Sequence, residues 1–416
     1  MDIKQSNNSQ TVNWEHLPEK NVLLQYLTRN DIIELSMCCK RYRKQFENQI
    51  FNVLSLTSWL HTNKDIRDKL KHSEVYDKLI LILKQNMGDK LKLVNKFIFK
   101  DVFCFGVAAE VFYLLHNVNS IEFSSPYCGC CGHTSLSFIN GRQNLEYITF
   151  QIYYESFNRF DKEGVIFSKS LKSLKINEEY SHYDDIPYFN SIDSSYTNLI
   201  TLYIPTNEML TNLTSTMPNL KNVGILYNRE IDESLVLKFI KKNPQLKKLE
   251  FYHWPSDKLI QEVLSLKFLS YLSIYTTAYC PLDNNIYPVN FSIKKLVLGE
   301  EVYGSKVIKL INACKMLVNL DLIYWCSEKL EEIEWNKLDQ SIKAIYLCYY
   351  SVCSEKNCIQ VLDTLKFFDK AIITVLDEED QDIKEFKEFN FTNLKNYKLS
   401  SMNDNSNSVT IIKTIK

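Results

Sequence analysis

A short apolar pattern that recurs along most of the chain constrains its fold more than any other feature. The spacing apolar-x-x-apolar-x-apolar is clear at Leu145, Ile148 and Phe150. Later copies begin at Leu171, Leu199, Leu220, Leu246, Leu269, Ile293, Leu317 and Ile342, and earlier ones begin at Val94 and Val118. Less regular copies lie around Ile373 and Val375 and at Leu394, Tyr397 and Leu399. From Leu145 the first positions are separated by 26, 28, 21, 26, 23, 24, 24 and 25 residues. This recurrence predicts stacked structural units rather than unrelated domains.

Each copy predicts one strand followed by one helix. The second half of the pattern has the period of 2 that a strand requires, and the stretches between copies carry helical spacing. These helical stretches are Leu235, Phe239, Ile240; Leu259, Val263, Leu264; Val307, Ile308, Ile311; and Ile359, Leu362, Leu365. Because a strand with its turn is narrower than a helix of ~10 Å diameter, stacked units curve. We therefore expect an α/β solenoid with parallel strands on its concave face and helices on its convex face.

Residues 93–400 resemble the ribonuclease-inhibitor-like, cysteine-containing class of leucine-rich repeats. The resemblance rests on the repeat length and on units such as Leu317-Val-Asn-Leu-Asp-Leu-Ile-Tyr-Trp-Cys326. The chain departs from the family because the Asn or Cys that usually follows the strand is mostly missing. Backbone groups in the turns then need other hydrogen-bond partners, so we expect an irregular arc.

Residues 14–51 predict three short helices. Leu17-Pro18 places a proline at a helix start, and Asn30 or Asp31 can cap a second helix. A third helix is expected from Lys40. Three helices in so few residues form a poor independent core, so a partner or the following array should cover apolar surface.

This segment resembles an F-box, through Leu17-Pro18, Tyr26-Leu27, Asp31-Ile32, Leu35-Ser36 and Cys39-Lys40-Arg41-Tyr42. The resemblance implies binding to a Skp-type adaptor of a cullin-based ubiquitin ligase, with the target held by the repeats. The implied adaptor contacts are Leu17, Pro18, Leu27, Ile32, Leu35 and Cys39. Alternatively, the segment only caps the open end of the solenoid.

The remaining parts of the chain complete the expected organisation. Residues 1–13 are expected to be a disordered tail, residues 52–92 a helical linker or N-terminal cap that contains the apolar stretch Val75 to Leu83, and residues 401–416 a C-terminal tail.

Composition excludes several classes of partner. The 49 Lys and Arg residues balance 50 Asp and Glu residues, which supplies no broad field for nucleic acid or membrane surfaces. The 12 cysteines are scattered without the spacing of a disulfide framework, and the polar segment from Met1 to Asn13 lacks a secretory signal. We expect reduced thiols and a cytoplasmic or nuclear protein.

Sites for catalysis or cofactors are not expected. The sequence has no Gly-rich phosphate loop, H-E-x-x-H or G-x-S-x-G motif, so we expect no enzyme and no cofactor. Cys128, Cys130, Cys131 and His133 are acceptable zinc ligands, but adjacent thiols without a C-x2-C spacing favour a loop over a metal site. A zinc-dependent module remains a third, weaker hypothesis.

Tyrosines concentrate at the positions expected on the concave face. Residues three, five and seven of each unit point away from the core, and these include Tyr203, Tyr252, Tyr271, Tyr275 and Tyr346. Tyrosine offers a large, stiff and amphipathic contact area, so these residues are candidate target-binding residues. The alternative is chance, because the chain has 25 tyrosines.

The expected function is a substrate receptor of a ubiquitin ligase, or a repeat scaffold without a ubiquitin link.

Overall fold

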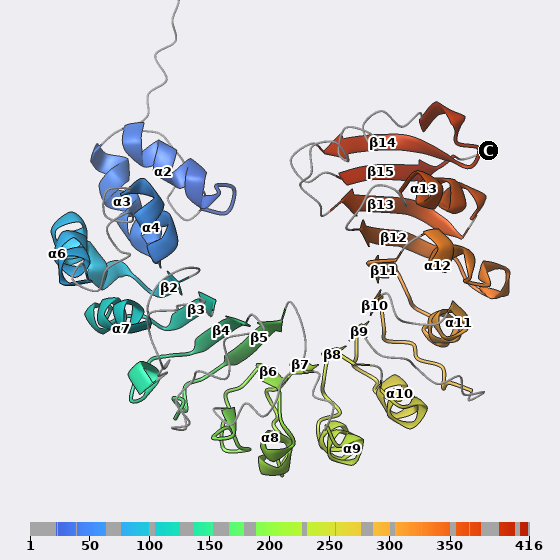
Figure 1. The fold of residues 1–416 in the computed structure, drawn as a ribbon, viewed down its shortest axis with the longest axis horizontal. Helices are drawn as coiled ribbons and strands as arrows, with labels where there is room; N and C mark the ends of the chain where they lie inside the picture. Colours follow the sequence, from blue (N-terminus) through green and yellow to red (C-terminus); the bar gives the residue numbers. More distant parts are fainter. Residues whose placement is uncertain are drawn as a thin grey trace, which may run out of the picture. The chain divides into compact units, whose positions relative to one another are not determined.

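The computed structural model is an α/β fold with a mostly parallel sheet (Figure 1). It describes residues 22, 24–38, 40–63, 76–99, 105–124, 137–152, 166–178, 189–226, 231–253, 255–275, 286–299, 304–325, 327–349, 355–365, 367–375, 391–403 and 408–414. The chain forms two compact units, Met1–Glu122 and Phe123–Lys416, and strand β3 (Ser120–Ser124) spans their junction.

The first unit is mainly helical. Its elements are α2 (Arg29–Cys38), α3 (Lys40–Phe51), β1 (Val53–Ser55), α4 (Leu56–Thr62), α6 (Tyr76–Met87), the 3-10 helix η3 (Gly88–Leu93), β2 (Lys96–Phe99) and α7 (Phe105–Leu114). Strands β1 and β2 pair in parallel, with Leu54 opposite Phe97. The predicted second and third helices of the N-terminal segment correspond to α2 and α3, and the apolar stretch from Val75 corresponds to α6.

Helix α2 begins earlier than the sequence indicated. The backbone N–H and hydroxyl of Thr28 both donate to Asp31 Oδ2, at 2.7 and 2.6 Å, and the N–H of Asp31 donates to Thr28 Oγ1 at 3.3 Å. These bonds form a capping box, in which Thr28 is the cap and Asp31 lies inside the first turn. The prediction that Asn30 or Asp31 caps this helix was therefore wrong by two or three residues.

The second unit alternates strands with helices. Its strands are β4 (Tyr147–Ile152), β5 (Ser173–Glu178), β6 (Thr201–Ile204), β7 (Asn222–Ile225), β8 (Lys248–Phe251), β9 (Tyr271–Ile274), β10 (Lys295–Gly299), β11 (Asn319–Ile323), β12 (Ile342–Tyr349), β13 (Phe368–Val375), β14 (Tyr397–Asn403) and β15 (Ser408–Lys413). Its helices are α8 (Asn207–Asn212), α9 (Glu233–Lys242), α10 (Asp257–Leu264), α11 (Gly304–Ala313), α12 (Ser327–Glu331) and α13 (Glu355–Thr364), with the 3-10 helices η4 (Ser137–Ile139), η7 (Trp335–Lys337) and η9 (Phe391–Asn393).

The repeated apolar pattern coincides with the strands. Strands β4 to β13 lie side by side in chain order, and each pair of neighbours is parallel. Equivalent apolar residues face each other, as Leu249 faces Leu272 and Leu272 faces Leu296, and all three are at most 1% exposed. Helices α8 to α11 follow along one side of these strands (Figure 1). The predicted alternation of parallel strands and helices is confirmed from β6 to β9 and from β10 to β13, whereas the described residues between β4 and β6 and between β9 and β10 include no α-helix.

The last predicted copy, at Leu394, Tyr397 and Leu399, does not continue the parallel array. Strand β14 pairs antiparallel with β15, which in turn pairs antiparallel with β13. Tyr397 is buried, but Leu399 is 40% exposed beside an irregularity in the pairing of β14. Residues 408–413, expected within a tail, form β15 because Val409 and Ile411 are fully buried. An antiparallel pair thus covers the free edge of β13.

Buried asparagine side chains form hydrogen bonds with backbone groups of the turns. The amide of Asn290 donates to the carbonyls of Leu264 and Leu266, and its Oδ1 accepts from the N–H groups of Ser292 and Ile293. Asn243 similarly donates to the carbonyl of Phe239 and accepts from the N–H of Met217. Each side chain therefore joins its own turn to a neighbouring repeat.

Candidate functional site

Side chains of adjacent strands form rows on the side of the sheet opposite the helices. Side chains alternate between the two faces of a strand, so residues between the core positions share this open face. One row, fixed by the strand register, consists of Tyr203, Gly224, Glu250, Ser273, Val297, Asp321 and Tyr346. We call the tyrosine face the group Tyr203, Lys248, Glu250, Tyr252, Tyr271, Tyr275, Lys295, Asp321 and Tyr346.

Tyr203 anchors one end of the tyrosine face. Its hydroxyl donates to Glu250 Oε2 at 2.5 Å, although β7 runs between the strands of the two residues. The intervening residue is Gly224, where an added Cβ would lie 2.7 Å from the Tyr203 ring. The missing side chain of this glycine allows the ring to lie across β7. Tyr203 is consequently only 6% exposed.

Lys248 extends this contact toward β9. Its ammonium lies 3.0 Å from Glu250 Oε1 and 4.5 Å from the centre of the Tyr271 ring. A cation over an aromatic ring is attracted to the negative face of the ring. Glu250 therefore accepts from Tyr203 and pairs with Lys248, which suits a carboxylate that is 6% exposed.

Lys295 and Asp321 form a second polar centre between Tyr271 and Tyr346. The Lys295 ammonium lies 2.6 Å from Asp321 Oδ2, 5.9 Å from the Tyr271 ring centre and 5.6 Å from the Tyr346 ring centre. The other oxygen, Asp321 Oδ1, is buried and accepts no hydrogen bond from the described residues. Burial raises the pKa of Asp321, and the hydrogen bond and charge of Lys295 oppose this shift. This carboxylate thus retains an unused acceptor.

Three tyrosine rings lie near one another at the C-terminal ends of β6, β8 and β9. The rings of Tyr252 and Tyr275 are stacked, with centres 5.2 Å apart, and Tyr203 and Tyr252 are 6.4 Å apart. Burial raises the pKa of Tyr203, Tyr271 and Tyr275, so these phenols remain neutral donors. The face offers aromatic rings, hydroxyl groups and fixed charges.

The structure brings the five predicted tyrosines into one surface. Tyr252, Tyr271, Tyr275 and Tyr346 are half-buried, whereas Tyr203 is buried against Gly224 and Glu250. Gly224 and the buried pair Ser273 and Val297 were missed as part of this surface. The strand register reveals them, because each occupies the same row as Tyr203.

The predicted adaptor contacts fall partly inside the core of the first unit. Ile32 is buried with Tyr42 and Phe46, and Leu27 and Leu35 pack against this cluster. Leu17, Pro18 and Cys39 lie outside the described residues. Large apolar side chains that are exposed among the described residues of the segment are Val22, Tyr26 and Met37, of which Tyr26 is 80% and Met37 65% exposed. These residues add exposed apolar surface to the segment.

The candidate zinc ligands Cys128, Cys130, Cys131 and His133 lie outside the described residues. Within the part of the chain that the structure describes, no three His, Cys, Asp or Glu residues are grouped so that they could hold a metal ion. The described thiol of Cys314 is buried, and burial raises its pKa to about 12.

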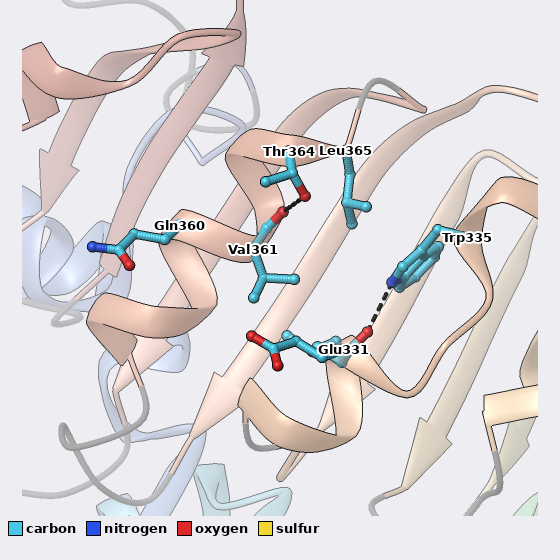
Figure 2. A pocket seen from close by; sticks show the side chains of 7 residues that line it. Glu331, Trp335, Gln360, Val361, Thr364 and Leu365 are labelled. Atoms are coloured by element: carbon cyan, nitrogen blue, oxygen red, sulfur yellow. Dashed lines mark hydrogen bonds between the residues drawn. The ribbon is translucent and has the colours of Figure 1, made fainter.

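A cavity of about 360 Å³ lies between α12 and α13 (Figure 2). It is lined by Leu330, Glu331, Trp335, Gln360, Val361, Thr364 and Leu365. The Trp335 indole N–H donates to the carbonyl of Leu330 at 2.9 Å, and the Thr364 hydroxyl donates to that of Val361 at 2.6 Å. The lining thus contains two donors that are already hydrogen-bonded, the carboxylate of Glu331 and the amide of Gln360. It does not place a nucleophile beside a base.

Comparison with known proteins adds no family. No protein-family model matches the chain, and a search of curated proteins finds no match. None of the helices in the described ranges is both long and apolar enough to cross a bilayer.

Proposed function

We propose that the chain is a curved solenoid of irregular leucine-rich repeats that binds another protein on its tyrosine face. The observation that carries the proposal is the row of aromatic and charged side chains from β6 to β12. Tyrosines held by neighbouring strands have little side-chain entropy left to lose on binding, which favours affinity. The partly exposed charges of Lys248 and Lys295 supply specificity.

We further propose that the N-terminal helical segment recruits a Skp-type adaptor, so that the chain acts as a non-catalytic substrate receptor of a cullin-based ubiquitin ligase. The support is the F-box resemblance together with the exposed side chains of Val22, Tyr26 and Met37 beside a small helical core. A receptor of this kind acts by proximity, because it holds the target near the transferred ubiquitin.

The alternative is a repeat scaffold without a ubiquitin link, whose N-terminal segment only covers the end of the array. One observation favours it, because Ile32, an implied adaptor contact, is 6% exposed and belongs to the core of its own segment. Loss of binding on changing Ile32 would therefore not distinguish an interface from a fold defect.

Surface substitutions separate the two functions. The purified chain is mixed with a Skp-type adaptor, and binding is measured for the wild type, Tyr26→Asp and Met37→Asp. The adaptor function predicts tight binding that both variants abolish, whereas Leu81→Asp, at a residue 55% exposed on α6, is a matched control that binds normally. No binding by the wild-type chain would leave the scaffold function.

The tyrosine face is tested by cross-linking in cells followed by mass spectrometry. A target should be recovered with the wild type and lost with Tyr275→Ala or Tyr346→Ala. Tyr113→Ala, in α7 of the first unit and 51% exposed in the wild type, is the control and should recover the same target. Equal recovery by all variants would place the binding site elsewhere.

A further inference from the structure

A second surface lies in the turns that precede the strands. Backbone hydrogen bonds of 2.8 to 2.9 Å connect successive turns there. The N–H of Lys247 donates to the carbonyl of Lys221, and the N–H of Ser270 donates to the carbonyl of Lys247. In the same way, the N–H of Lys294 donates to the carbonyl of Ser270, and the N–H of Val318 donates to the carbonyl of Lys294. Side chains of these turns are therefore neighbours along one edge.

Apolar side chains protrude from three of these stacked turns. Phe268, Phe291 and Met316 are 63%, 71% and 52% exposed. The turn of Phe291 contacts both others, because Asn290 donates to the carbonyl of Leu266 at 3.1 Å and accepts from the N–H of Lys315 at 2.9 Å. The extended segment before Phe291 adds Ile286, 90% exposed, and Val289, 51% exposed. Exposed apolar side chains gathered in this way mark an interaction site.

Lysines flank this apolar group. Five lysines are exposed on the same turns or on the next ones, and none of them forms an ion pair with a described residue. They are Lys221, Lys247, Lys267, Lys294 and Lys343. The acidic Asp339 at this edge is already paired with Lys315 at 2.6 Å. The edge therefore carries a local positive charge that the net charge of -1 conceals.

We propose that this edge, with Phe268, Phe291 and Met316 flanked by lysines, docks on the surface of an anionic membrane. The apolar side chains enter the boundary between headgroups and acyl chains, and the ammonium groups face lipid phosphates and carboxylates. This proposal departs from the sequence-based expectation of no membrane partner, which rested on the charge of the whole chain.

Two observations favour lipid over other anionic partners. The apolar side chains protrude from turns, and a fluid lipid surface needs no matching shape. Ile286, Val289 and Met316 have no aromatic face on which a nucleobase could stack, whereas hydrocarbon accepts them as readily as phenylalanine.

Vesicle co-sedimentation of the full chain tests the proposal. Vesicles of phosphatidylcholine with about 30% phosphatidylserine should sediment the wild type, whereas phosphatidylcholine alone should not. Binding should weaken at least about tenfold in Phe268→Ser/Phe291→Ser, and about fivefold for each of Lys247→Glu and Lys294→Glu. Lys398→Glu/Leu399→Ser, at exposed residues of β14, should bind like the wild type.

A second readout does not depend on loss of binding. Phe291→Trp should shift its added fluorescence to the blue on mixing with anionic vesicles, and brominated lipids should quench it. The proposal is overturned if the wild type does not sediment with anionic vesicles, or if all variants sediment equally. It is also overturned if only single-stranded RNA or polyglutamate binds in a manner that depends on Phe268 and Phe291.

Discussion

The Tyr203 hydroxyl reaches Glu250 Oε2 at 2.5 Å across a strand that belongs to neither residue. The ring can do so because Gly224, opposite Tyr203 in the register, has no side chain. Three consecutive repeats are thereby joined on the open face of the sheet as well as in the core. This arrangement makes one end of the tyrosine face a fixed part of the fold.

Removing the Tyr203 hydroxyl should destabilise the chain measurably. In Tyr203→Phe the buried carboxylate of Glu250 loses a donor, and leaving a buried acceptor unsatisfied costs about 1 to 3 kcal/mol. Urea unfolding of the two proteins measures this difference. Tyr147→Phe, at a residue 41% exposed, is the control and should change the free energy of unfolding by less than about 0.5 kcal/mol. Equal stability of Tyr203→Phe and wild type would show that the bond contributes nothing.

A methyl group at Gly224 should displace the Tyr203 ring. The Cβ in Gly224→Ala would meet Tyr203 Cδ1 at 2.7 Å, so overpacking should cost about 1 to 3 kcal/mol. Because the clash depends on the ring, Tyr203→Ala should remove much of the penalty, and the two changes should be non-additive. Thermal unfolding of the wild type, the two single variants and the double variant Gly224→Ala/Tyr203→Ala measures this non-additivity. Additive effects would mean that the ring does not lie over Gly224 in solution.

The sequence predicted the repeating core well and the open face less well. Leu249, Leu272 and Leu296 were identifiable because stacking units must bury one apolar side, and that requirement leaves a period in the sequence. The burial of Tyr203 leaves no such signal, since it depends on a glycine one repeat away and a carboxylate two repeats away. Likewise, β15 closes the sheet antiparallel through only Val409 and Ile411, too short a pattern to distinguish from a tail.

Asn290 should be among the most sensitive polar residues of the second unit. Its side chain is 4% exposed and bonds two carbonyls and two N–H groups, so Asn290→Ala leaves several buried groups unsatisfied and should cost about 3 kcal/mol. Asn198→Ala, which removes one exposed bond to the carbonyl of Lys169, should cost about 0.5 kcal/mol. Urea unfolding compares them. Similar losses in the two variants would contradict a joining role for Asn290.

Alkaline pH should weaken the fold through its buried phenols. Burial raises the pKa of Tyr203, Tyr271 and Tyr275 above the ordinary value of 10.0. Above about pH 10 the unfolded chain loses protons that the folded chain retains, so the free energy of unfolding falls as pH rises further. Phenolate absorbance, followed in native and urea-unfolded protein, should show a group of tyrosines that ionise only on unfolding. Identical titration curves would contradict the burial.

The pair of Lys306 and Asp257 should act as a unit. The two side chains are 2% and 4% exposed, their charged atoms lie 3.5 Å apart, and the Tyr287 hydroxyl donates to Asp257 Oδ1 at 2.8 Å. Lys306→Met leaves a buried carboxylate without its cation, which should cost about 3 to 5 kcal/mol. Adding Asp257→Asn removes the charge but keeps an acceptor for Tyr287, so stability should partly return.

The exposed pair of Lys337 and Glu334 provides the comparison for this cycle. Its atoms are closer, at 2.6 Å, yet the side chains are 61% and 49% exposed, so Lys337→Met should cost less than about 1 kcal/mol. Urea unfolding of the wild type, Lys306→Met, Lys306→Met/Asp257→Asn and Lys337→Met measures these free energies of unfolding. Two outcomes would contradict this prediction: Lys306→Met costs no more stability than Lys337→Met, or adding Asp257→Asn to Lys306→Met lowers stability further. In either case the buried carboxylate would not depend on Lys306, and apolar packing alone would join α10 and α11.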